Sequence, residues 1–147
     1  FRVLEKKGFE IKKKKIAERS VYLELVYERV SVRLEATFQK KDLKLIDYEK
    51  IDGRIIAIYG LTPEELTKEK AITYLKRRKV RDIYDVFFLL KLIKDIKQIS
   101  KEIEQLINNY APPEDEENLK TIILQGIVPT AKQMIEYIKR KWENPKI

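Results

Sequence analysis

Apolar and polar side chains alternate along much of the first sixty residues, a pattern of period two that indicates half-buried β-strands. The clearest case is VSVRLEATF, where five apolar side chains from Val30 to Phe38 face one way and polar side chains face the other. The segments FEIKKKK and SVYLELVYE before it alternate less regularly, and Asp52-Gly53 after it is a two-residue hairpin signal. We therefore expect a sheet of about four or five largely antiparallel strands in residues 1–60.

At Leu61 the pattern changes to that of helices. The segment LTPEELTKEKAITYLKRR begins with Thr62 as N-cap, Pro63 in the first turn and Glu65 completing a capping box. Further helices are predicted from about Arg81 to Ile96, after a Ser100 cap, and over NLKTIILQG and TAKQMIEYIKRKW, with the acidic loop Ala111–Asn118 as a connection. Strands followed by helices predict the α+β class, with the helical region 61–147 packed on the sheet of residues 1–60 as one unit.

The composition limits the chemistry that the chain can perform. Its 147 residues suffice for one domain with a real core, and they include no cysteine and no histidine. Disulfides, thiolate metal sites, zinc sites and a histidine base are therefore excluded. Any reaction must use carboxylates, Lys, Arg, Tyr or the backbone, and a hard cation such as Mg²⁺ is the metal that such ligands suit.

The charge indicates a class of partner. A net charge of +8 favours a polyanion such as nucleic acid or nucleotide phosphate, although a lysine-rich surface of a thermophile protein would give the same value. The run Lys12–Lys15 has the same two interpretations, an RNA contact or a solvated edge strand. No apolar run is long enough to span a membrane and no signal peptide is visible, so we expect a soluble, cytoplasmic protein without a membrane partner.

Charged residues gather in KRRKVRDIYD, directly before the fully apolar run VFFLL. On one helix Asp82 and Asp85 share a face, and the spacing predicts that Arg78 pairs with Asp82 and Arg81 with Asp85. Acidic residues at a helix start also complement the helix dipole, and charge pairs at this spacing are common on solvated surfaces.

The preceding predicted helix carries Lys70 and Arg77 on one stripe, which could aim at the same place. Cations together with two carboxylates are a means of holding a triphosphate and Mg²⁺ where no histidine is used. The pattern by itself leaves both interpretations open, an active site and an elaborate helix start.

The segment Glu64–Leu90 resembles a signature of the AbiEii/AbiGii toxin family of nucleotidyltransferases. In that family a helix with a Glu-Lys pair is followed by an arginine, then by Arg-Asp-apolar-Tyr-Asp and an apolar helix. The matching positions here are Glu69-Lys70, Arg77, Arg81-Asp82, Tyr84 and Asp85. The resemblance implies that residues 1–60 are the β-rich part of a nucleotidyltransferase-like core.

The resemblance also implies a reaction, the transfer of a nucleotide from an NTP to an acceptor such as tRNA or another RNA. The protein would be the toxin of a type IV toxin–antitoxin or abortive-infection pair, with Mg²⁺ as cofactor and an antitoxin protein as partner. Lys70, Arg77 and Arg81 would bind phosphate, and the catalytic residues would be Lys70, Asp82 and Asp85. Glu35 would be a metal ligand, although a glutamate on an exposed strand face needs no function.

One family motif does not occur in the sequence. A glycine turn followed by an Asp-x-Asp strand should precede the matched segment, and the chain opens on Phe1 with neither. We therefore expect either the C-terminal portion of such an enzyme or a remnant, inactive by itself in both cases. The alternative is a non-catalytic basic α+β module that binds RNA or an antitoxin partner.

Overall fold

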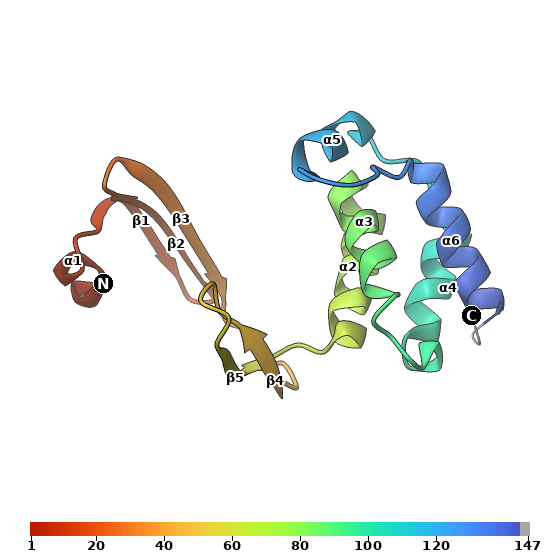
Figure 1. Ribbon diagram of the computed structural model, residues 1–147, viewed down its shortest axis with the longest axis horizontal. Helices are drawn as coiled ribbons and strands as arrows, with labels where there is room; N and C mark the ends of the chain where they lie inside the picture. The colour runs from red at the N-terminus through yellow and green to blue at the C-terminus, as the bar shows by residue number, and fades with distance from the viewer. Residues whose placement is uncertain (145–147) are drawn as a thin grey trace. The chain divides into compact units, whose positions relative to one another are not determined.

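The computed structural model describes residues 1–144 and confirms the α+β class (Figure 1). The strands are β1 Glu10–Ala17, β2 Ser20–Tyr27, β3 Val30–Thr37, β4 Lys44–Glu49 and β5 Ile55–Gly60. The α-helices are α1 Arg2–Lys6, α2 Pro63–Arg77, α3 Val80–Leu89, α4 Ser100–Asn108, α5 Leu119–Ile122 and α6 Ala131–Glu143. Two 3-10 turns are η1 Ile96–Ile99 and η2 Glu116–Asn118. The chain forms two compact units, Phe1–Asp42 and Leu43–Ile147.

The first unit is a three-stranded antiparallel sheet in the order β1-β2-β3. Glu28 and Arg29 join β2 to β3 with φ angles of 45° and 70°, the left-handed conformation that a type I′ hairpin turn requires at both positions. The central strand is buried at Leu23 and Leu25, whereas Leu34 on the edge strand β3 remains 40% exposed. The alternation in β3 therefore predicted the strand correctly but overstated its burial within this unit.

The two remaining strands, β4 and β5, form a separate antiparallel hairpin. Within residues 1–144 the five strands thus make two sheets, where the sequence indicated one. The hairpin loop is also longer than the predicted two residues, because the last strand pair is Glu49 with Ile55. Within this loop Asp52 accepts hydrogen bonds from the backbone and the side chain of Arg54, and Gly53 adopts a φ of 77°.

Of the predicted helix caps, Thr62 is confirmed, whereas Ser100 is wrong because it is the first residue of α4 and no side chain caps that helix. Thr62 accepts a hydrogen bond from the backbone N–H of Glu65 over 3.3 Å, and Thr130 and Gln133 form a capping box at the start of α6. The second predicted helix ends early, at Leu89, because the chain turns there and Asp95 starts the η1 turn by capping Lys97.

The helices of the second unit pack side by side around one core (Figure 1). Its buried hydrophobic side chains are Ala71, Tyr74, Val80, Ile83, Val86, Leu90, Ile93, Ile96, Ile99, Ile103, Leu106, Leu119, Ala131, Met134, Ile135 and Ile138. Tyr74 stacks on Tyr110 with ring centroids 6.0 Å apart, and its hydroxyl donates to the carbonyl of Ala111 over 2.6 Å. The predicted packing of the helical region on the β-rich region stays a prediction.

The acidic loop does more than connect two helices. Asp115 accepts a hydrogen bond from the backbone N–H of Val80 over 2.8 Å, and Glu116 accepts one from Ala131 over 2.7 Å. These donors are first-turn N–H groups of α3 and α6, which have no partner within their own helices. The loop therefore supplies the start of α3 with a cap that lies 35 residues away along the chain.

None of the helices within residues 1–144 combines the length and the apolar character that a membrane span needs.

Replacing Tyr74 by phenylalanine should lower the free energy of unfolding by about 1 kcal/mol near neutral pH, because the bond to Ala111 is lost. Burial, followed by the nearby Tyr110, raises the pKa of Tyr74 above its ordinary value of 10.0. The unfolded chain therefore ionises this hydroxyl at a lower pH than the folded chain. Its stabilising contribution is complete below about pH 10 and is lost as the pH rises further.

Urea titrations of both proteins at about pH 7 and about pH 10.5 measure this contribution as a difference. The difference in unfolding free energy between wild type and Tyr74→Phe should be smaller at the higher pH. A difference that does not change with pH would contradict the role of the buried hydroxyl.

Candidate functional site

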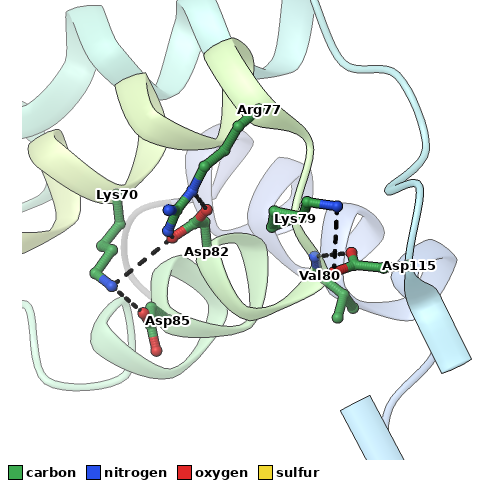
Figure 2. Close-up of polar contacts among 7 residues, drawn as sticks. All are labelled: Lys70, Arg77, Lys79, Val80, Asp82, Asp85 and Asp115. Atoms are coloured by element: carbon green, nitrogen blue, oxygen red, sulfur yellow. Dashed lines mark hydrogen bonds and ion pairs between the residues drawn. The ribbon is translucent and has the colours of Figure 1, made fainter. Parts of the chain in front are cut away.

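The charged residues that the sequence singled out meet between α2 and α3. Lys70 and Arg77 on α2 point toward Asp82 and Asp85 on α3 (Figure 2). Only two residues join these helices, and the first of them, Arg78, adopts a left-handed φ of 46° that ends α2. A connection this short places the last turn of α2 beside the first turn of α3. We call Lys70, Arg77, Asp82 and Asp85 the Lys70 cluster.

Asp82 is the buried anchor of the Lys70 cluster. Its side chain has no solvent exposure, and Arg77 grips both of its oxygens, with Nε 2.7 Å from Oδ2 and Nη2 2.8 Å from Oδ1. Lys70 Nζ lies 3.8 Å from Oδ1. The hydrogen bonds to Asp82 raise the pKa of Arg77, so the guanidinium stays charged. A carboxylate bound in this way orients cations and has little capacity left for a metal ion.

Lys70 and Asp85 form the open side of the cluster. Lys70 Nζ lies 2.5 Å from Asp85 Oδ2, and the two side chains are 34% and 37% exposed. Arg77 is 42% exposed and uses two of its five N–H groups on Asp82. Two cations and one carboxylate are therefore accessible from solvent.

The two arginine pairings predicted along one helix are not found. Arg78 forms an ion pair with Glu114, and Asp82 binds Arg77 instead. The prediction was wrong because α2 ends before Arg78, so Arg78 and Asp82 do not share a helix. Arg81 is exposed and has no ion pair within residues 1–144, while Asp85 binds Lys70. The phosphate-binding role of Arg81 stays a prediction.

Glu35 lies in the first unit, on the polar face of β3. Its side chain is 62% exposed, and its Oε1 lies 3.9 Å from Nε of Arg33. Among the residues that the structure describes, no three carboxylates gather closely enough to hold a metal ion by themselves. Mg²⁺ often binds through one or two carboxylates together with substrate phosphates, and in the Lys70 cluster Asp85 is the carboxylate with the required exposure. The metal role of Glu35 stays a prediction.

The contribution of Asp115 to this site was missed in the sequence. Asp115 caps Val80, and its Oδ2 lies 3.8 Å from Nζ of Lys79, so it holds the helix start from which Asp82 projects (Figure 2). The signal was an acidic run after Pro112-Pro113, which indicated only a connection.

The fold and the Lys70 cluster describe an α+β protein whose helical part presents cations paired with carboxylates. A family model described as "Nucleotidyl transferase AbiEii toxin, Type IV TA system" matches residues 2–141. The chain therefore belongs to the AbiEii family of nucleotidyltransferase toxins from type IV toxin–antitoxin systems, as the motif at Glu64–Leu90 indicated. The search of curated proteins found no match, and neither did the search of solved structures.

Replacing Asp82 by asparagine should lower the free energy of unfolding by about 2–3 kcal/mol, because Arg77 loses a charged, two-point hydrogen-bond partner. Asp85→Asn is the matched control, since it breaks the ion pair between Lys70 and Asp85, in which both side chains are partly exposed. Its cost should stay below about 1 kcal/mol. Urea unfolding at neutral pH measures both values. Equal losses in the two variants would show that Asp82 is not the anchor.

Proposed function

We propose that the Lys70 cluster binds the triphosphate of an NTP for nucleotide transfer, with Lys70 and Arg77 as the phosphate-binding cations. The observation that carries this proposal is that both cations are held by carboxylates while a third or more of each side chain is open to solvent. A preformed pair of oriented cations loses little side-chain freedom when an anionic ligand arrives. Membership of a nucleotidyltransferase family supplies the reaction type.

Each residue of the cluster has a separate part in this proposal. Lys70 exchanges its contact with Asp85 for a phosphate oxygen, which releases the Asp85 carboxylate. Asp85 can then bind Mg²⁺ or accept a proton from the attacking hydroxyl, and Asp82 is a positioning residue that orients Arg77. Mg²⁺ would supply neutralisation of the phosphate charge. Arg81, exposed on the same helix, would add a further phosphate contact.

Membership of the family supports the remaining parts of the proposal. The acceptor is tRNA or another RNA, and an antitoxin protein is the partner that limits the activity. The second candidate is a basic module that binds RNA without catalysis, which would also use the net charge of +8.

Replacing Lys70 by alanine should weaken the binding of an NTP about tenfold or more, because a charge-assisted contact to phosphate is lost. Each of the four NTPs is titrated with MgCl₂ into the 147-residue chain in a calorimeter. The matched control is Lys76→Ala, which removes an exposed lysine from the same helix; within residues 1–144 Lys76 has no ion pair. Circular dichroism confirms that both variants are folded.

The two variants separate the possible outcomes. If Lys70→Ala and Lys76→Ala bind nucleotide as wild type does, the cluster is not the triphosphate site. If both weaken binding equally, the attraction comes from net charge and has no specific site.

A further inference from the structure

A groove with aromatic walls lies between the end of α3 and the face of α6. It encloses about 460 Å³. Its lining includes Tyr84, Phe87, Phe88, Lys91, Tyr137 and Arg140. Within each of the two segments the lining residues are spaced about three or four positions apart. They therefore lie along one face, which borders the groove. We call this surface the aromatic groove.

The rings of the groove are packed against one another yet remain reachable. Phe87 meets Tyr137 edge to face with centroids 5.0 Å apart, which joins the two walls. Tyr84 lies 6.4 Å from Phe88 in a nearly parallel arrangement. Phe88 is 49% exposed, so one part of its ring is open to solvent. The groove therefore offers a flat π surface to a ligand.

The two cations of the groove lie over its rings. Lys91 Nζ is 4.1 Å from the centroid of Phe87, and the guanidinium carbon of Arg140 is 5.8 Å from that of Tyr137. None of the residues that line the groove is acidic, and neither cation has an ion pair within residues 1–144. Positive charge without carboxylates next to exposed rings complements a ligand that carries both anionic groups and flat bases.

We propose that the aromatic groove binds a single-stranded segment of RNA, with a base stacked on Phe88 and backbone phosphates at Lys91 and Arg140. Stacking requires unpaired bases, because the faces of bases in a duplex are covered by their neighbours. An apolar protein segment would cover the rings but would bring no anionic group to the two cations. Tyr84 in the groove and Asp85 in the Lys70 cluster are consecutive on α3, so one helix carries both sites.

The choice of RNA over DNA rests on the proposed function, in which RNA is the acceptor. The binding itself does not depend on nucleotide transfer. It is therefore measured in the absence of NTP and Mg²⁺, where a failure of the triphosphate site has no effect on the result.

The test is fluorescence anisotropy of a labelled twelve-nucleotide RNA of mixed sequence, titrated with the 147-residue chain at several salt concentrations. Phe88→Ala should weaken binding about tenfold, the loss of one stacked base. Phe88→Leu keeps an apolar side chain but removes the π face, and it should show a similar loss. Tyr59→Ala is the matched control, since Tyr59 is 75% exposed outside the groove and its replacement should change nothing.

The phosphate contacts are tested by the salt dependence. Replacing both Lys91 and Arg140 by glutamine should reduce the slope of log K against log salt by about 1.4, since each contact with a single strand contributes about 0.7. The matched double variant replaces Lys101 and Lys120 by glutamine. Both are exposed lysines outside the groove, so the slope should stay unchanged.

Four results would overturn the inference. The RNA is not bound at all, or both Phe88 variants bind it as tightly as wild type does. A duplex of the same sequence competes as well as the single strand, which removes stacking as the cause. A DNA strand of the same sequence binds equally well, which removes the assignment to RNA.

Discussion

The buried ion pair between Arg77 and Asp82 determines how α2 and α3 present their charges. An ionised carboxylate without solvent exposure is tolerated only when its oxygens are bound, and Arg77 binds both. Because Arg77 is the last residue of α2 and Asp82 lies in the first turn of α3, this requirement keeps the two helix ends together. Lys70, two turns earlier on α2, is thereby brought to Asp85. A buried charge that contributes little net stability can still specify one arrangement of the accessible cations.

The helix α3 links the parts of the molecule that are proposed to bind ligands. Its first turn is anchored through Asp82, Asp85 comes one turn later, and the aromatic stripe of the groove runs to its end. Successive residues of a helix point in directions about 100° apart, so one short helix can serve two surfaces. A displacement of α3 would therefore change both proposed binding surfaces together.

Much of this arrangement could be predicted from the sequence. The cap at Thr62 depends on a neighbour within three residues, and local patterns record such contacts well. The approach of Lys70 to Asp85 was also predicted, from the motif that resembles the family. The pairing of Arg78 was mispredicted because i, i+4 spacing holds only within one helix, and Arg78 lies on the other side of the helix break from Asp82. Contacts between distant segments, such as Asp115 with Val80, leave no periodic signal.

The cap that Asp115 supplies has a consequence for the order of folding. A helix whose cap lies within a few residues can form early in folding. The N–H group of Val80 gains its partner only when the chain brings Asp115, 35 residues downstream, to the start of α3. The loop that carries this carboxylate also accepts the first-turn N–H of α6 through Glu116. Closure of so long a chain segment is an entropic cost that the remaining helices must offset by packing first. The arrangement of the Lys70 cluster is therefore expected to be complete only when the helices of the second unit have folded, so incompletely folded chains emerging from the ribosome would lack it.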